Sequence, residues 1–494
     1  MKQTRPKQRP RTMTTPPLAE RDTQAWETEL DRWLAPFTDV LGDARRKPWL
    51  SAYVRGLLST SDRKSLSPLA DHVATQLTAA EATTPRPRYH HLQQFITTSP
   101  WDVAPVLRLL AQRADAMLGG PEAVLIIDDT ALRKWGHHSV GVARQYCGEI
   151  GTLTHCQALV SLTLAQGEVP IPLALRLFLP AEWTDDPTRC ADAGVPPAAR
   201  QARTKHDLAL AELQRVREAG VRFGLVTADA AYGTSAAFRH AISTLGYRYA
   251  VGVQSHVRVY PVDATLVYPP RRQRPRQTVP RQPVRPRRQP GTPTDPTTAA
   301  VGRRRVRPMA SEPSHTVAEL LQGAYWQTVR WRDGTRGPLR GRWTAVRVRP
   351  ADGAMGTKGE HMPGEPTWLV GEQRPDGTRR YYFTNHPAYW SLKKLVQAIR
   401  SRWVCEQAHL QLKQDLGLDH FEGRSWRGLE HHTCLTMLSF AFLQHLRLTT
   451  SRRRGKKNAR SDPAARPTAV AHTPDGPACP HCQALLGDAL LPPL

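Results

Sequence analysis

The sequence predicts an α/β fold in which a mixed sheet is flanked by helices. Short apolar runs that end in polar residues are typical of buried strands, and runs with apolar residues three and four apart are typical of helices. The predicted strands are 122–130, 155–165, 170–180, 221–229 and 247–254, and the predicted helices among them are 197–219 and 234–245. The order strand, strand, strand, helix, strand, helix, strand is that of a mixed α/β layer.

A helical domain is predicted before this core, over residues 17–118. Its first helix carries an amphipathic stripe made of Trp26, Leu30, Trp33, Leu34 and Phe37. Further helical runs cover 49–58, 68–77 and 103–118. Ser99-Pro100 followed by Trp101-Asp102 is a start signal for the last of these helices. We expect this domain to bind DNA ends, with charge supplied by six basic residues, namely Arg45, Arg46, Lys47, Arg55, Arg63 and Lys64.

The core, whose first part is 119–257, is interrupted after its last predicted strand. Residues 258–312 form an Arg/Pro-rich linker that cannot bury a core. Residues 313–388 are predicted to be a β-rich insertion, because apolar and polar residues alternate between turn signals at Asp333-Gly334 and Asp376-Gly377. The four tryptophans of this insertion fit either a sheet core or stacking on a nucleobase, and the core interpretation is favoured.

Residues 389–448 return to the core as helices. One long helix is predicted over 390–417, with an apolar stripe that includes Ile399, Trp403 and Leu410, and a second helix over 433–448. The two ends of the chain, 1–16 and 449–494, are basic and polar and are predicted to be a disordered arm and tail.

The composition points to a polyanionic partner. The chain of 494 residues has 69 Lys and Arg against 43 Asp and Glu, a net charge of +26. Nucleic acid is the first candidate and an anionic membrane surface the second. No stretch approaches the roughly 20 apolar residues that span a bilayer, and no secretory signal is evident. Seven scattered cysteines favour a reduced, cytoplasmic compartment.

Three carboxylates are predicted to converge. Asp129 and Asp229 each close a predicted strand, and sites form at the carboxyl ends of strands in open α/β sheets. Glu406 occupies a position on its helix where the period calls for an apolar residue. A carboxylate there needs a partner, and a set of hard oxygen ligands suits Mg²⁺ or Mn²⁺. Two such ions about 3.5–4 Å apart could cleave a phosphodiester.

Two basic residues accompany Glu406. Arg402 precedes it by four residues and Lys413 follows it by seven, so both lie near its face of the helix and could hold a DNA phosphate. The alternative is an ordinary helix salt bridge between Arg402 and Glu406, worth a few tenths of a kcal/mol.

Three sequence blocks resemble those of the bacterial insertion-sequence DDE transposases, in particular the group of insertion sequence 701, a sister of the insertion sequence 4 group. The blocks are IIDDTALRKWGHHSVGVARQYCGEIGTLTHCQ at 126–157, VTADAAYG at 226–233 and RWVCEQAHLQLKQDLGLDHFEGRSWRGLEHH at 402–432. RYHHLQQFITTSPWD at 88–102 is similar to a block upstream of the first Asp. The resemblance runs from about residue 20 to about residue 446.

The resemblance implies a ribonuclease-H-like core and a metal-dependent DNA transposase. It places the catalytic, metal-binding triad on Asp129, Asp229 and Glu406, with two Mg²⁺ or Mn²⁺ ions, and it assigns DNA contacts to Arg402 and Lys413. The implied partners are double-stranded DNA, as terminal inverted repeats and target, and a second copy of the chain on that DNA. The implied location is cytoplasmic, associated with the nucleoid.

Two points stay open at the level of the sequence. Asp128 and Asp129 are alternative candidates for the first catalytic aspartate, and Asp129 is favoured because Thr130 follows it, as in the wider group. The signature tyrosine of that group is replaced here by Ile399. Two alternative functions also remain: a catalytically inactive, domesticated DNA-binding protein, and a metal-dependent nuclease that cuts without joining.

Overall fold

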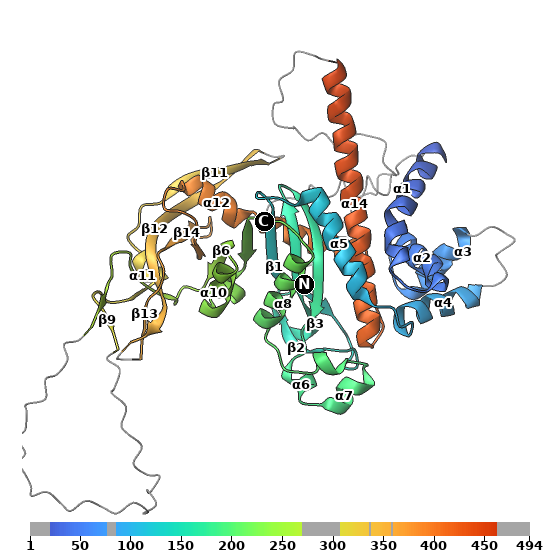
Figure 1. Ribbon diagram of the computed structural model, residues 1–494, viewed down its shortest axis with the longest axis horizontal. Coiled ribbons are helices and arrows are strands. Elements are labelled where there is room, and N and C mark those ends of the chain that lie inside the picture. Colours follow the sequence, from blue (N-terminus) through green and yellow to red (C-terminus); the bar gives the residue numbers. More distant parts are fainter. Residues whose placement is uncertain (1–19, 77–84, 269–306, 335–336, 357–358, 462–494) are drawn as a thin grey trace, which may run out of the picture. The chain divides into compact units, whose positions relative to one another are not determined.

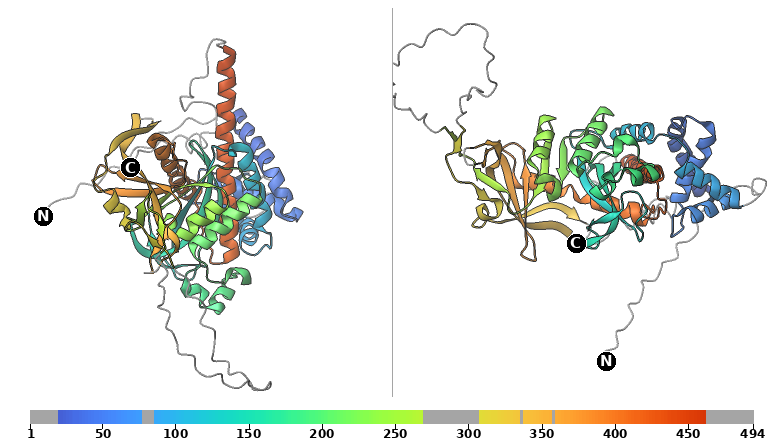
Figure 2. Two further views of the ribbon diagram at one scale, coloured as in Figure 1. Left: turned by 60° about the vertical axis from the view of Figure 1, so that its left-hand side comes forward. Right: turned by 90° about the horizontal axis from the view of Figure 1, so that it is seen from below.

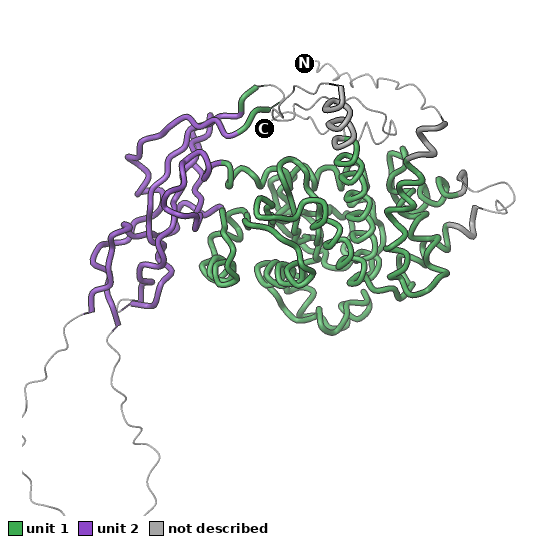
Figure 3. The backbone as a smooth tube through the Cα atoms, turned by 45° about the horizontal axis from the view of Figure 1, so that its top comes forward, with its two compact units in different colours: residues 1–251, 332–338, 397–494 green, residues 252–331, 339–396 purple. Residues whose placement is uncertain are grey.

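The computed structural model describes residues 20–76, 85–268, 307–334, 337–356 and 359–461. The chain divides into two compact units, shown in Figure 3. Unit 1 comprises 1–251, 332–338 and 397–494, and unit 2 comprises 252–331 and 339–396. The basic arm 1–16, and all of the tail beyond residue 461, lie outside the described residues.

Unit 1 begins with helices, as the sequence predicts. They are α1 (Glu20–Asp39), the short 3₁₀ helix Ala44–Arg46, α2 (Lys47–Leu57), α3 (Leu66–Gln76), α4 (Pro85–Thr97) and α5 (Val103–Leu118). The stripe of α1 is buried at Leu30, Trp33 and Phe37. The Asp102 carboxylate accepts a hydrogen bond from the Ala104 N–H at the start of α5, which confirms the predicted start signal.

The long helix α14 (Trp426–Ser461) anchors these helices. It appears as one continuous rod in the left view of Figure 2 and lies beside α2, α4 and α5 (Figure 1). Tyr53 of α2 donates to Nδ1 of the buried His432 at 2.9 Å, and Nε2 of that ring lies 3.1 Å from the Gly417 carbonyl oxygen. His431 stacks on Trp101 with a ring separation of 3.7 Å. A pair of consecutive histidines therefore ties the helical region to the core.

The central sheet of unit 1 is mixed and ribonuclease-H-like, which confirms the predicted fold class. Its strands are β1 (Val124–Arg133), β2 (Ala143–Cys147), β3 (Thr152–Gln166), β4 (Val169–Leu177), β5 (Leu225–Ala228) and β6 (Arg248–Val253). β1 pairs antiparallel with β3 and parallel with β5, which pairs parallel with β6. β3 also pairs antiparallel with β2 and with β4, and Gly167 turns the predicted hairpin at a positive φ of 59°.

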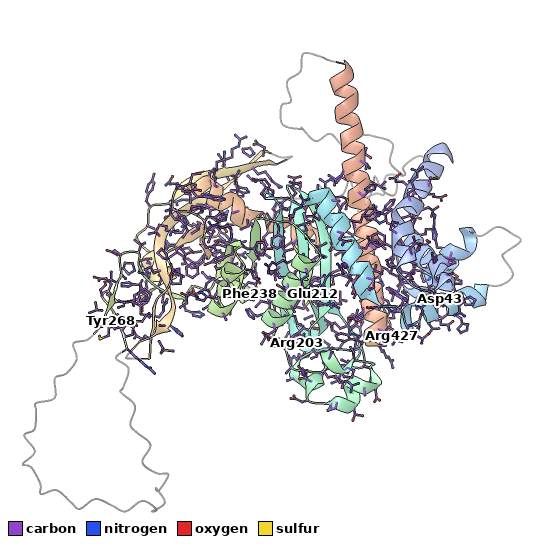
Figure 4. The ribbon with its side chains drawn as sticks, viewed as in Figure 1. Asp43, Arg203, Glu212, Phe238, Tyr268 and Arg427 are labelled. Carbon is purple, nitrogen blue, oxygen red and sulfur yellow. The ribbon has the colours of Figure 1, made fainter. Side chains whose placement is uncertain are left out.

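Helices cover this sheet. They include α6 (Ala181–Thr184), α7 (Pro187–Asp192), the 3₁₀ helix Pro197–Ala199, α8 (Lys205–Glu218), α9 (Ala230–Gly233) and α10 (Ala236–Thr244). Arg176 of β4 forms ion pairs with Glu212 of α8 and Glu430 of α14, so one side chain joins the sheet to two helices; Figure 4 labels Glu212 among them. Among the described residues no helix is long and apolar enough to cross a bilayer.

The predicted long helix over 390–417 is wrong in one respect, because it is two helices. α12 (Leu392–Arg400) ends before α13 (Trp403–Gln414) begins. The Ser401 hydroxyl donates to the Ala398 carbonyl and competes with the backbone at the break. The break shifts the helical phase, so Val404 and Cys405 face the core, whereas the Glu406 side chain is 53% exposed. Glu406 therefore does not face the core as its spacing predicted.

Unit 2 is rich in β-structure, as predicted. It contains β7 (Arg258–Pro261), β8 (Leu266–Val267), β9 (Met309–Ala310), β10 (His315–Thr316), α11 (Val317–Leu320), β11 (Gln327–Gly334), β12 (Gly337–Met355), β13 (His361–Pro363), β14 (Thr367–Gln373) and β15 (Arg379–Thr384). β12, β14 and β15 pair antiparallel in succession, and Trp343 of β12 is fully buried. That burial agrees with the sheet-core interpretation of this tryptophan.

Two predicted irregular segments carry regular structure where they are described. The predicted linker 258–312 contains strands β7, β8 and β9 at its ends, and its middle, 269–306, lies outside the described residues. The predicted tail is helical as far as Ser461, since α14 continues through 449–461. Arg, Lys and Ala in that stretch are good helix formers, so local propensity extends the buried helix.

The buried His432 predicts a pH-dependent stability. Burial lowers the pKa of His432 to about 4, below the ordinary value of 6.5. The neutral ring therefore contributes stability that is complete above pH 6.5 and is lost as the pH falls through about 4. We expect this residue to account for about 3 kcal/mol of the loss in unfolding free energy between pH 7 and pH 4.

Urea unfolding of the wild type and of His432→Gln at both pH values measures this contribution. Between pH 7 and pH 4, the unfolding free energy of the variant should fall by about 3 kcal/mol less than that of the wild type. His137→Gln, at an exposed histidine, should behave as the wild type does. An equal pH dependence in all three proteins would contradict the assignment.

Candidate active site

Two consecutive aspartates project from opposite faces of β1. Side chains alternate along a strand, and Ile126, two residues before Asp128, packs against Val404 and Cys405 of α13. Asp128 therefore faces α13, and Asp129 faces the opposite side, where α8 and α9 begin. β1 does not end at these residues as predicted but continues to Arg133, so both aspartates lie within the strand.

The third aspartate follows the neighbouring strand. β5 runs parallel to β1 with Ile127 paired to Ala228, so Asp229 follows in register beside Asp128 and Asp129. The Asp229 carboxylate caps α9 by accepting the N–H groups of Ala231 at 3.0 Å and Tyr232 at 3.3 Å. Because adjacent strands lie about 4.8 Å apart, the register places Asp229 next to the two β1 aspartates, which themselves point to opposite faces of the sheet.

Asp129 has two partners on its face of the sheet. The Tyr232 hydroxyl donates to Oδ1, and the Lys205 ammonium contacts Oδ2 at 2.5 Å. Lys205 is the first residue of α8, whose start is fixed by a capping box between Thr204 and Asp207. Burial and the nearby Asp129 charge raise the pKa of Tyr232, so its hydroxyl stays protonated and remains a donor.

Arg402 links Asp128 to Glu406. One guanidinium nitrogen of Arg402 donates to Asp128, and the other donates to Glu406 Oε1 at 2.5 Å. Glu406 lies one turn along α13 from Arg402, so the helix sets their separation. The predicted salt bridge between Arg402 and Glu406 is therefore present, and it extends to the buried aspartate.

The charges of this cluster shift the pKa of Asp128. Burial raises the pKa of Asp128 to about 7; Arg402 opposes this shift, and the negative charges of Asp229 and Glu406 add to it. The Asp128 side chain is only 12% exposed, compared with 29% for Asp129 and 53% for Glu406. Asp128 is thus the inner member of the cluster, and Asp129 and Glu406 are its accessible members.

A buried polar network lies beneath Asp128. The His409 Nε2 atom lies 2.9 Å from the Ser161 hydroxyl and 3.5 Å from the Cys405 thiol, which is also 3.5 Å from the Thr163 hydroxyl. Burial raises the pKa of Cys405 to about 12 and lowers that of His409 to about 3, so both are neutral near pH 7. Because Arg402 already neutralises Asp128, we interpret this network as the anchor of α13 on β1 and β3.

The structure also shows what the sequence did not reveal. Lys205 and Tyr232 both contact Asp129. Of the two, only Tyr232 could have been noticed in the sequence, because it lies three residues after Asp229 within the second block. Lys413 lies seven residues from Glu406 as counted, and its ammonium is paired with Glu149 at 3.1 Å. Arg402 contacts two carboxylates, of which the sequence indicated one.

The donor set fits a hard divalent cation. Carboxylate oxygens are the ligands that Mg²⁺ and Mn²⁺ prefer. Asp128, Asp229 and Glu406 lie near the Arg402 guanidinium, whereas Asp129 projects from the other face of β1. The cations of Lys205 and Arg402 lie against the oxygens of Asp129 and Glu406. The excess of carboxylates over these two cations leaves negative charge that a divalent ion could compensate.

Comparison with known proteins identifies the family of this chain. The family model of the DDE superfamily endonucleases matches residues 36–338. The chain belongs to this family. The matched stretch includes β1 and β5 with their aspartates and ends before Arg402 and Glu406. Members of this superfamily generally use divalent metal ions.

A similar protein named as a transposase supports the same grouping. The chain is 29% identical over 166 residues to the "Probable transposase for insertion sequence element IS701" of Microchaete diplosiphon. The alignment covers 33% of this chain and 40% of the relative's length. The predicted resemblance is thereby confirmed at the level of the DDE superfamily endonucleases, and a protein named as an insertion-sequence transposase is among the similar proteins.

The pair between Arg402 and Asp128 predicts a measurable stability effect. Removing one partner of a buried ion pair typically costs 3–5 kcal/mol, but a proton can neutralise Asp128 because its pKa is about 7. We therefore expect Arg402→Gln to lower the unfolding free energy by about 3 kcal/mol at pH 7.5, and Asp128→Asn in that background to restore part of the loss.

Chemical denaturation of the single and double variants tests this. Lys47→Gln is a matched control, because its pair with Asp39 is exposed and should contribute less than about 1 kcal/mol. A loss in Arg402→Gln no larger than that in Lys47→Gln would show that the buried pair contributes little.

Proposed function

We propose that this protein is the transposase of a bacterial insertion sequence, which binds the ends of its element and carries out metal-dependent DNA cleavage and strand transfer. The observation that supports this best is the convergence of acidic residues from β1, β5 and α13 in a member of the DDE endonuclease family. The relative from Microchaete diplosiphon, named as a transposase, supports the same activity.

We assign the metal ligands to Asp129, Asp229 and Glu406. Asp129 stands within β1, Asp229 directly follows the neighbouring strand β5 and caps α9, and Glu406 stands on a helix anchored by its buried neighbour Cys405. Two Mg²⁺ or Mn²⁺ ions bound there would activate water and stabilise the leaving oxygen of an in-line displacement. The protein would position the ligand oxygens and balance their charge. This mechanism requires no covalent bond between the protein and the DNA.

Asp128 has a different proposed role. Its carboxylate is buried and is occupied by Arg402, which in turn contacts Glu406. Asp128 would therefore act as a positioning residue: it fixes the Arg402 guanidinium, which restricts the Glu406 side chain to the edge of the cluster. Accessibility to DNA favours Asp129 over Asp128 as the ligand, since the cleaved phosphate must reach the metals.

The remaining assignments concern partners. The net charge of +26 favours a DNA duplex, and Arg402 and Lys413 are the proposed phosphate contacts near Glu406. Lys413 would leave Glu149, which is an exposed partner and holds it only weakly. Two copies of the chain would pair two element ends, and the protein would act on chromosomal DNA in the cytoplasm, at the nucleoid.

We expect Asp129→Asn, Asp229→Asn and Glu406→Gln to abolish cutting without abolishing binding. Each variant should lower the cleavage rate of a duplex carrying the element's terminal repeat by at least about 10³-fold in Mg²⁺. Gel shift should show binding to the same duplex within a few-fold of the wild type, because the phosphate contacts are unchanged. Joining of pre-cut ends to target DNA distinguishes a transposase from a nuclease that only cuts.

Tight, salt-sensitive binding by a wild type that cuts in neither Mg²⁺ nor Mn²⁺ would reject the proposal. It would instead indicate a DNA-binding protein that has lost its activity. Cleavage that persists in Glu406→Gln would reject the third ligand.

A double-mutant cycle separates the roles of the two adjacent aspartates. If Asp128 acts through Arg402, Asp128→Asn should lower cleavage in the wild type but add little in the Arg402→Gln background. Asp129→Asn should remain strongly damaging in both backgrounds, and only it should weaken Mn²⁺ binding by the DNA-free protein. An additive effect of Asp128→Asn, with weakened Mn²⁺ binding, would make Asp128 the ligand.

A further inference from the structure

One tryptophan of the described chain is almost wholly in solvent. Trp135, two residues beyond the end of β1, is 93% exposed, whereas Trp183 and Trp343 are buried. Exposing an indole forfeits the large gain from burying its apolar surface. The neighbours along the chain from Arg133 to Ser139 are charged, polar or glycine, so Trp135 is the one large apolar side chain of this segment.

The exposure of Trp135 does not come from a loose loop. The preceding Lys134 donates its backbone N–H to the His155 carbonyl at 3.1 Å and its ammonium to the Phe421 carbonyl at 2.5 Å. On the other side, the His137 ring packs edge-on against His155, 4.3 Å between centroids, and Arg189 donates to the His137 carbonyl at 2.9 Å. The backbone is held on both sides of Trp135, so its indole is presented from a fixed base.

One cation lies against this indole. The Arg133 guanidinium lies 5.5 Å from the centroid of the Trp135 ring, within the range of a cation–π contact. Lys134 and Arg189 hold the loop with their side chains and add two more cations nearby. An aromatic ring with a cation against it suits a nucleobase and its phosphates.

We propose that Trp135 is a stacking site for an unpaired base of the bound DNA. The inference rests on the proposed function and extends it, because Trp135 follows the proposed ligand Asp129 by six residues on the same chain segment. At about 3.3 Å per residue the two are at most about 20 Å apart, the length of about six base pairs. The stacked base would therefore lie within about six base pairs of the cleaved phosphate.

The test uses the full chain and duplexes carrying one unpaired 2-aminopurine within six base pairs of the terminal cleavage site. The wild type should quench the fluorophore at one of these positions, and Trp135→Ala should lose that quenching and bind the duplex at least about 10-fold more weakly. Trp135→Phe keeps an aromatic face and should retain quenching and most of the affinity. Tyr389→Ala, at another exposed aromatic (84%), is the matched control and should resemble the wild type.

The outcomes separate this inference from the function on which it rests. Equal quenching and affinity in Trp135→Ala and the wild type, at every position, would overturn the stacking site even if the wild type cleaves the repeat. A wild type that neither cleaves nor prefers the repeat would reject the transposase proposal, and the same comparison on an arbitrary duplex with an unpaired base would still decide the role of Trp135. Loss of affinity in Trp135→Phe equal to that in Trp135→Ala would also contradict stacking.

Discussion

The contact of Arg402 with both Asp128 and Glu406 is the interaction on which the candidate site depends. A carboxylate as buried as Asp128 is costly unless a cation or a proton compensates it. Arg402 supplies that cation from the start of α13, and its second nitrogen reaches one turn along the same helix to Glu406. The stability of the core and the position of the outermost acid are thus linked through one guanidinium, which a lysine could not reproduce with its single nitrogen.

The sheet supplies the other constraint. A parallel pairing of β1 and β5 in register makes Asp229 a neighbour of the two β1 aspartates, whatever the loops do. Capping of α9 by Asp229 then fixes its carboxylate, and Tyr232, on the first turn of that helix, reaches back to Asp129. The end of β5 and the short helix α9 therefore connect Asp229 to Asp129. In the same way, Arg402 connects Asp128 to Glu406.

Much of this arrangement could be predicted from the sequence, and the exceptions have physical causes. Strands such as β3 and β4 and helices such as α5 followed from periodicity, because local hydrophobic patterns agree with their burial. The exposure of Glu406 could not be predicted, since it depends on the break between α12 and α13, where the Ser401 hydroxyl bonds to the Ala398 carbonyl. Nor could Lys205, whose partner Asp129 stands 76 residues earlier and is brought near only by the fold.

The charge balance of the cluster suggests why its members differ in burial. Four carboxylates, Asp128, Asp129, Asp229 and Glu406, meet two cations, Lys205 and Arg402, which leaves a formal charge of −4 + 2 = −2 when all are ionised. Two divalent ions would turn this into +2 and make the same surface attractive to DNA phosphates. Asp128 is the buried member of the cluster, and Arg402 compensates its charge. The change of charge from −2 to +2 would therefore occur at the accessible carboxylates, where a DNA phosphate could bind.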